Sequence, residues 1–458
     1  MGSRLADFGA YAHLWATPTL RDVFAEQAVY QRWLDVLVAL AEVQAELDIV
    51  PRSAAAAIAE HADASGLDLD RVAAATRTTG HSTLGLIQEL QRLLPDDAAR
   101  WVYYGATVQD VTDTATAIAL REVARAVHDD LRGIEAECLR LSVAHRDTPM
   151  VGRTHGQAGS PITFGWKAAG WADEVRRHIE RLREGAPRWT AGQLGGAVGT
   201  LGFFEERGIE LRTRFCARLG LTDPGISWLA ARDRIAEFGA VSALISATTA
   251  RIGNEVLQLQ RGEIGEVRES RPPDAVGSIT MPHKRNPERA EHLVTLSRLV
   301  RANATVLLEG MVSEHERDAR GWKAEWVALP EVCLLTGAAT SMCRAMLEEL
   351  EVDADAMLRG VWATHGRFAS ERLLAQLSPT LGKHEAQRLL QELFASGTAD
   401  PGELSRSLAA DPRLADLFRE DVLVELLARP DVGAAGVMVD EVVARAHRAR
   451  VADPEHWP

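Results

Sequence analysis

RDRIAEFGAVSALISATTARIGNEVLQLQR, residues 232–261, is the stretch that decides the expected fold. Its hydrophobic side chains recur at spacings of three, four or seven residues, at Ile235, Phe238, Val241, Ile245, Ile252, Val256 and Leu259. This spacing is typical of one face of an α-helix. A helix of this length is roughly two to three times longer than the globular mean. Because such a helix needs partners of similar length, we expect a bundle of long helices.

Four further stretches predict those partners. Residues 112–146 contain no proline and a single glycine, Gly133, and residues 163–185 follow Pro161 with a similar pattern. Residues 286–312 and 330–351 continue it. We therefore predict a central bundle of roughly five long helices.

Shorter helices are predicted on both sides of the bundle. On the N-terminal side they span residues 22–48, 53–64 and 83–94. On the C-terminal side, residues 353–458 are broken by prolines at positions 379, 401, 412 and 430. The predicted fold class is all-α, with three helical domains: an N-terminal domain (1–110), the long-helix bundle (111–351) and a C-terminal domain (352–458).

The charge balance excludes several classes of partner. The chain has 51 basic and 65 acidic residues, a net charge of −14, which argues against binding nucleic acid or an anionic membrane. Its four cysteines are scattered, which fits a reducing compartment. The N-terminus does not resemble a signal peptide, and no run of 18 apolar residues occurs. We expect a cytoplasmic protein without a membrane span.

Four segments between the long helices look non-helical, and we expect the chemistry there. They are residues 103–110, 152–163, 192–202 and 262–287, which are rich in small residues, proline and hydroxyls. The glycines of 192–202 do not have the G-x-G-x-x-G spacing, so we do not interpret them as a dinucleotide site. The histidines show no metal-ligand spacing, and neither a metal nor another cofactor is expected.

The segment GSITMPHKRNP, residues 277–287, is the most informative. Lys284, Arg285 and Asn286 precede a predicted helix and offer donors for a carboxylate. Ser278 becomes a base only if backbone N–H groups and a cation stabilise its alkoxide. The alternative is a solvated basic turn.

Two other loops carry candidate residues. His155, in GRTHGQ (152–157), has an unperturbed pKa near neutrality and so suits proton transfer, although a lone loop histidine is more often structural. Thr107, Gln109 and Asp110 form a polar loop whose alternative role is an N-cap, which Asp110 would serve for a helix starting near residue 111.

Together these segments resemble the aspartase/fumarase superfamily. Residues 277–287 match its signature G-S-S-x-M-P-x-K-x-N-P except that Ile279 replaces the second serine. YYGATVQDVTDTA resembles the first region of that family, and GRTHGQ its second. The resemblance implies a homotetramer with a twenty-helix core, in which each active site takes its three regions from three different subunits.

The resemblance also implies roles in catalysis. Ser278 matches the base that removes a proton from the carbon next to a carboxylate. Lys284 and Asn286 are placed to stabilise the resulting aci-carboxylate, after which a leaving group departs from the adjacent carbon. His155 resembles the general acid of adenylosuccinate lyases. The 262–282 segment resembles the mobile loop that closes over the substrate.

The same resemblance implies the residues that bind a small dicarboxylate. Thr107 and Thr154 look like carboxylate-binding hydroxyls. Gln109 and Arg153, from the same two regions, and Arg317, from His315-Glu316-Arg317-Asp318, complete the expected set.

The branch of the superfamily is indicated by other motifs. MPHKRNP, Arg232-Asp233-Arg234 and residues 315–318 resemble adenylosuccinate lyase and 3-carboxy-cis,cis-muconate cycloisomerase. GWKAEW (321–326) resembles the cycloisomerase, and it places Trp322 and Trp326 where adenylosuccinate lyases supply a Ser and an Arg to a phosphate. Two indoles are poor ligands for a phosphate dianion, which argues against a nucleotide substrate.

The expected reaction is β-elimination of fumarate from a small substituted succinate. Bacterial cycloisomerases carry a Trp at the position of His155, and Val108 replaces a Ser common to both groups. We expect a C–N lyase acting on nitrosuccinate or an aspartate-like compound, with nitrosuccinate favoured. The alternatives are the muconate cycloisomerase, adenylosuccinate lyase and an inactive structural homologue.

Overall fold

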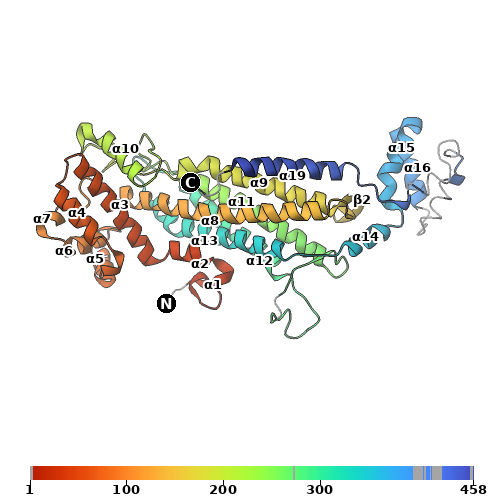
Figure 1. Cartoon of the computed structure of the whole chain (residues 1–458), viewed down its shortest axis with the longest axis horizontal. Coiled ribbons are helices and arrows are strands. Elements are labelled where there is room, and N and C mark those ends of the chain that lie inside the picture. Colours follow the sequence, from red (N-terminus) through yellow and green to blue (C-terminus); the bar gives the residue numbers. More distant parts are fainter. Residues whose placement is uncertain are drawn as a thin grey trace.

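The computed structural model describes residues 4–271, 274–395 and 427–453, with isolated positions at 406, 409–412, 414, 425 and 457. It is an elongated, mostly helical molecule built around long helices that run side by side (Figure 1). Five helices of 22–37 residues form the centre: α8 (Val108–Ala144), α9 (Phe164–Trp189), α11 (Asp233–Gln260), α12 (Glu288–Glu309) and α13 (Ala319–Glu348). The predicted long-helix bundle is therefore confirmed.

Helix α8 is the longest element of the bundle. Thr107 and Asp110 form a capping box at its start, which satisfies backbone N–H groups of the first turn. Its 37 residues extend about 55 Å at 1.5 Å per residue. Residues such as Leu120, Val123 and Ile134 are fully buried against the other long helices. Burial of this kind stabilises a helix far more than intrinsic propensity does.

Helix α13 differs from its predicted start at residue 330. It begins at Ala319, where the side chain of Asp318 accepts a hydrogen bond from the N–H of Arg320, and Pro330 lies inside it. A proline removes one helical hydrogen bond but does not end a helix that packing holds on both sides. The GWKAEW segment is consequently helical.

The N-terminal helices lie near the start of α8, where α2 and α3 contact it, except α1, which packs on α13. They are α1 (Ala12–Trp15), α2 (Pro18–Val23), α3 (Glu26–Glu46), α4 (Arg52–His61), α5 (Leu69–Thr79), α6 (Leu84–Leu93) and α7 (Asp96–Ala99). The single helix predicted over 22–48 is divided at Phe24 and Ala25, where Arg32 donates a hydrogen bond to the Val23 carbonyl. Helix α10 (Gly208–Arg218) joins the same hydrophobic cluster.

The C-terminal stretch is divided between two clusters. Helices α14 (Ala354–Trp362), α15 (Ser370–Leu381) and α16 (Lys383–Ala395) lie at the far end of the molecule, whereas α19 (Ala435–Ala452) runs back along α9 (Figure 1). Pro379 lies inside α15 rather than ending it. Pro412 and Pro430 lie outside the assigned helices, and Pro401 is outside the described residues.

Two small antiparallel sheets correct the all-α prediction. Strands β1 (Pro149–Thr154) and β2 (Gln157–Thr163) form a hairpin, and β3 (Val267–Arg268) pairs with β4 (Glu351–Val352). Both residues of the hairpin turn have positive φ, 55° at His155 and 75° at Gly156. This is the mirror-image turn that matches the twist of two adjacent strands, so GRTHGQ forms a hairpin and not an open loop.

Helices α11 and α13 are long and apolar enough to cross a membrane by length and composition alone. In this fold 61% and 67% of their apolar windows are buried inside the chain. Central helices of a bundle need such a composition, so these two helices are accounted for by the core.

A buried ion cluster fastens the C-terminal helix to the bundle. Glu135 accepts hydrogen bonds from Arg176 on α9 (2.6 Å to each oxygen) and from Arg450 on α19 (2.6 Å), and its side chain is fully buried. Asp453, just after α19, pairs with Arg132, Arg176 and Arg183.

Replacing Glu135 should therefore destabilise the fold strongly. Glu135→Ala removes the buried carboxylate that joins Arg176 to Arg450 and leaves the buried Arg176 with Asp453 as its one acidic partner among the described residues, which costs about 3–5 kcal/mol. Glu137→Ala, which breaks the solvent-exposed pair with Arg140, should cost less than about 1 kcal/mol. Urea unfolding followed by circular dichroism measures both, and equal shifts of the two midpoints would contradict this assignment.

Candidate functional site

The first group of site residues lies at the start of α8. Arg317 donates one hydrogen bond to Thr107 Oγ1 (2.9 Å) and another to the carbonyl of Ala197 (2.9 Å). The guanidinium is solvent-exposed and carries five N–H donors, so donors remain for a ligand. Thr107 and Arg317, which the sequence predicts to bind a carboxylate, are thus brought together.

Asp110 joins this group to the glycine-rich segment 192–202. Its carboxylate accepts hydrogen bonds from the N–H groups of Thr107 (2.8 Å), Gly195 (2.8 Å) and Gly196 (3.0 Å). The N-cap is Thr107, so the alternative prediction of Asp110 as N-cap is corrected to the third helical position. Burial raises the pKa of Asp110 to about 7, against the lowering effect of the three N–H donors and of Arg317.

Gln109 does not face this site. Its side chain is buried, and the amide nitrogen donates to the Leu229 carbonyl (3.2 Å) and, at 3.4 Å, to Asp113. Gln109 thus has protein partners within one chain, and its predicted role in binding substrate stays a prediction.

Tyr103 is a neighbour that the sequence reasoning missed. Its hydroxyl lies beside Thr107 and Thr83, and burial together with the charge of Asp110 raises its pKa. Its backbone has a φ of 63°, unusual for a bulky residue. The only signal in the sequence was its place in the Tyr-Tyr pair that precedes Gly105-Ala106-Thr107.

The second group lies at the hairpin. Thr154 and His155 are exposed at the β1–β2 turn. Arg153 is not free, because it makes two hydrogen bonds, of 2.9 and 2.7 Å, to the buried carboxylate of Glu266. The structure thus places Arg153 as a tie between the hairpin and the segment after α11, and its predicted substrate contact stays a prediction.

The third group is the loop before α12. The backbone N–H of Met281 donates to Ser278 Oγ (3.1 Å), and the side-chain amide of Asn286 donates to the Gly277 carbonyl (2.9 Å). Lys284 is exposed, and its N–H bonds to the Met281 carbonyl (2.9 Å). Ser278 therefore receives one of the backbone donors that an alkoxide needs.

The stem of this loop is fixed. Glu269 is nearly buried and accepts hydrogen bonds from the first-turn N–H groups of Arg289 (3.2 Å) and Ala290 (2.7 Å) in α12. Residues 267–268 pair with β4, and Glu266 is held by Arg153. Among the described residues, the part of the loop without these ties begins at residue 270, later than the predicted mobile loop of 262–282.

Within one chain the first group lies far from the other two. Thr107 caps the start of α8, and β1 follows directly after its end, so the helix alone separates Thr107 from the hairpin by about 55 Å. Ser278 follows α11, which begins just after Leu229, beside Gln109, and extends about 42 Å. Figure 1 shows β2 at the opposite end of the bundle from α3 and the loop before α12 projecting from its side.

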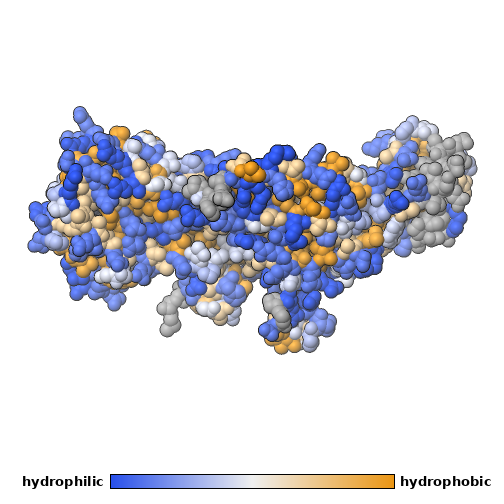
Figure 2. Space-filling view, in the orientation of Figure 1, coloured by the Kyte–Doolittle hydropathy of each residue, from blue (hydrophilic) through white to orange (hydrophobic). Residues whose placement is uncertain are grey.

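Hydrophobic residues are exposed on α12, just after it, and on the loop that precedes it. On and after α12 they are Leu299, Val306, Leu308, Met311 and Val312, and on the projecting loop they are Val276, Ile279 and Met281. Figure 2 shows hydrophobic colour at the tip of that loop and over the middle of the bundle. Patches of this kind are characteristic of surfaces that another chain covers.

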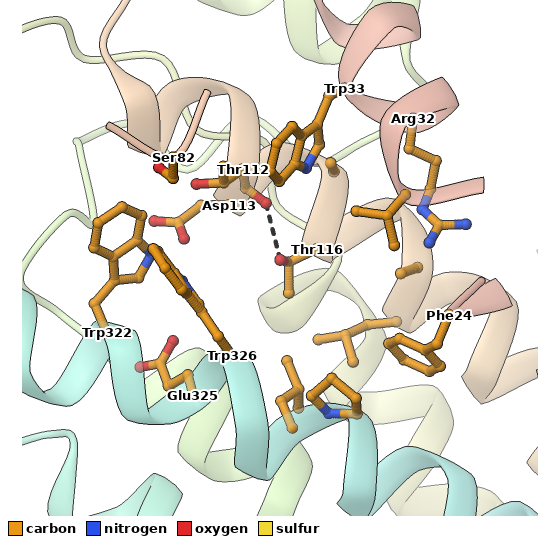
Figure 3. Close-up of a pocket in the computed structure, with 16 residues that line it drawn as sticks. Phe24, Arg32, Trp33, Ser82, Thr112, Asp113, Thr116, Trp322, Glu325 and Trp326 are labelled. Atoms are coloured by element: carbon orange, nitrogen blue, oxygen red, sulfur yellow. Dashed lines mark hydrogen bonds between the residues drawn. The ribbon is translucent and has the colours of Figure 1, made fainter. Parts of the chain in front are cut away.

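A cavity of about 290 Å³ opens beside the first group, between α3, α8 and α13. Figure 3 shows the indoles of Trp322 and Trp326 standing beside Asp113, with Trp33 across the cavity. The two α13 indoles pack edge to face, with ring centroids 4.8 Å apart. Trp322 is almost buried, whereas Trp326 is 45% exposed.

Each charged side chain around the cavity has a partner, and one guanidinium serves two carboxylates. Arg232 bonds to Asp113 (2.8 Å) and to Glu325 (2.9 Å), and both carboxylates face the cavity. Arg32, the one cation among the described residues that line it, donates to the Val23 carbonyl and lies 3.9 Å from Glu122. Burial lowers the pKa of Arg32 and raises that of Glu325. These lining residues therefore offer no free cation that could bind a phosphate group.

The raised pKa of Asp110 predicts a pH dependence of stability. Unfolded Asp110 ionises near its ordinary pKa of about 3.9, whereas the folded residue keeps its proton to about pH 7. The unfolded state is then favoured as the pH rises through this window. Relative to Asp110→Asn, wild-type stability should fall between about pH 4 and pH 7 in denaturant titrations. The raised pKa is contradicted if the difference in unfolding free energy between the wild type and Asp110→Asn stays constant, or if it shifts in favour of the wild type as the pH rises.

Comparison with known proteins agrees with the fold and the motifs. Residues 14–301 match the family model described as Lyase. The chain is 38% identical over 447 residues to N-acetyl-S-(2-succino)cysteine lyase of Dickeya dadantii, covering 97% of this chain and 98% of the relative. It is 34% identical to 3-carboxy-cis,cis-muconate cycloisomerase of Pseudomonas putida, covering 91% and 99%. The crystal structure of a fumarate lyase from Mesorhizobium sp. BNC1 superposes with a TM-score of 0.86 at 31% identity, covering 94% and 98%. The chain belongs to this lyase family, the aspartase/fumarase superfamily.

Proposed function

We propose that the protein is a C–S lyase that releases fumarate from an S-(2-succinyl) thioether, with N-acetyl-S-(2-succino)cysteine as the model substrate. The observation that carries this proposal is the 38% identity, over nearly the whole chain, to a lyase named for that compound. It replaces the C–N bond and the nitrosuccinate favoured by the sequence alone. The match of residues 277–287 to the superfamily signature supports an active enzyme rather than an inactive homologue.

The proposed site is assembled from several copies of the chain. A succinyl group spans only a few ångströms, whereas α8 alone extends about 55 Å between Thr107 and the chain that leads into the His155 hairpin. Both can touch the same substrate only if they come from different chains. The exposed hydrophobic residues of α12 provide a surface for such an association, and a homotetramer satisfies both requirements.

The chemistry follows from the charges that the site would hold. Ser278, as alkoxide, takes the proton from the carbon next to one carboxylate, and the Met281 N–H stabilises the serine oxygen. Lys284 and Asn286 stabilise the dianion. The electron pair of the broken C–H bond forms the double bond of fumarate, and the C–S pair departs with the thiolate. Arg317 and Thr107 hold the other carboxylate.

A thiolate departs more easily than an amine. The thiol, which is the conjugate acid of the thiolate, has a pKa of about 8.5, so the sulfur needs little protonation as the C–S bond breaks. An amine leaving group must be protonated, which requires a general acid. The position of His155 on an exposed turn makes it available for that role toward a neighbouring chain.

A substrate panel tests the proposal. Fumarate release, followed by its ultraviolet absorbance, should occur with N-acetyl-S-(2-succino)cysteine at a kcat/KM well above those for nitrosuccinate, aspartate and adenylosuccinate. Loss of the diene absorbance of 3-carboxymuconate would instead identify a cycloisomerase. If the thioether releases no fumarate while another substrate of the panel is turned over, the proposed substrate class is wrong.

Ser278→Ala should remove the base. We expect kcat to fall by about 10²–10⁴-fold, the range for loss of a general base, with little change in thermal stability. Ser278 makes one hydrogen bond in the described structure, from Met281, so the fold does not depend on it. Ser160→Ala, at an exposed hydroxyl that contacts Glu371, is the matched control. Near-normal turnover of Ser278→Ala would refute the assignment.

His155→Asn should separate the two leaving groups. We expect a loss of less than about tenfold with the thioether and about 10²-fold or more with any N-substituted aspartate that the enzyme accepts. Steady-state kinetics with both substrates measures the ratio. Equal losses would mean that His155 does not act as the acid.

A further inference from the structure

No step of the proposed reaction involves the cavity beside Thr107 and Arg317. We propose that it binds the apolar part of the substituent carried on sulfur, so that S-(2-succinyl) thioethers with an acyl group bulkier than acetyl are the preferred substrates. This inference rests on the proposed function and deepens it by assigning the substrate class. It concerns one chain only, because α3, α8 and α13 of the same chain form the walls.

The cavity is close enough to the carboxylate-binding pair to share a ligand with it. Thr112 and Asp113 line the cavity, and Thr107 lies five residues before Thr112 on the same helix, about 7.5 Å along its axis. From the other side, Trp322 is five residues after Arg317, and Asp318 caps the helix between them. A carboxylate held by Arg317 and Thr107 therefore lies about 7.5 Å along α8 from the first residues of the cavity wall.

The cavity is larger than an acetyl group requires. Its volume of about 290 Å³ is near the lower limit for small-molecule sites, which span roughly 300–1,000 Å³. An acetyl methyl would leave most of this space empty or filled by water. The indoles of Trp33, Trp322 and Trp326 and the ring of Phe24 offer apolar faces to a larger group (Figure 3).

The charges disfavour an anionic group. Asp113 and Glu325 share the single guanidinium of Arg232, and Arg32 is held by the Val23 carbonyl and Glu122, so the cavity offers no free cation to an anion. An anionic group would lose hydration without gaining a partner. A neutral acyl group gains by burial against the apolar side chains of the wall. The side chains thus favour an apolar N-acyl group over a phosphate.

The test is a series of S-(2-succino)cysteine derivatives that carry acetyl, butanoyl, hexanoyl or benzoyl on nitrogen. With the wild-type enzyme, kcat/KM should rise by roughly fourfold per added methylene until the cavity is full. Trp326→Ala should flatten this dependence, and Trp326→Phe should restore most of it. Trp166→Ala, which removes an indole of similar exposure (41%) on α9, should leave the dependence unchanged.

The outcomes separate this inference from the proposed function. If the acetyl compound yields fumarate but kcat/KM stays constant or falls with acyl length, the proposed acyl cavity is wrong. The proposed thioether lyase activity is unaffected by that result. No fumarate from any member overturns the proposed function itself. The wild-type series requires no mutation, so a variant that fails to fold does not affect the decision.

Discussion

The straight length of α8 is the constraint on which the whole arrangement depends. A helix of 37 residues cannot bring the residue at its start to the residue that follows its end. Hydrogen bonding within the helix and burial of its side chains on the other long helices make it a rigid spacer of about 55 Å. Any small substrate that touches both Thr107 and the hairpin must therefore lie where the ends of different chains meet.

Ion pairs with buried carboxylates position the helices and loops that surround each end of α8. At the Thr107 end, Arg232 at the start of α11 joins Asp113 of α8 to Glu325 of α13. At the other end, Arg153 joins the hairpin to Glu266 in the stem of the serine loop. Pairs like these fix geometry more than they add stability, because desolvation offsets much of their attraction. In this protein they leave Arg317 and Lys284 as exposed cations of the proposed site.

The sequence predicts the helices of the bundle well and some of the site poorly. Long periodic segments such as 232–261 correspond to helices because burial reinforces their pattern. The hairpin at 149–163 was missed, since its short strands flank glycines and its turn carries a histidine with positive φ. The motifs predict substrate contacts for Arg153 and Gln109 from residue type, and within one chain these residues bond to Glu266 and the Leu229 carbonyl, which are distant in sequence. Position along a motif could not reveal those contacts.

Mixing two inactive variants tests the central claim most directly. Ser278→Ala and Arg317→Gln each disable every site in their own oligomer, and they alter opposite ends of one chain. If each site takes these residues from different chains, dissociating and reassembling an equal mixture should restore about a quarter of the wild-type sites. Native mass spectrometry confirms that hybrids have formed. Activity that stays at the level of the parents in such hybrids would show that Ser278 and Arg317 act within one chain, or in separate sites, and would contradict the account.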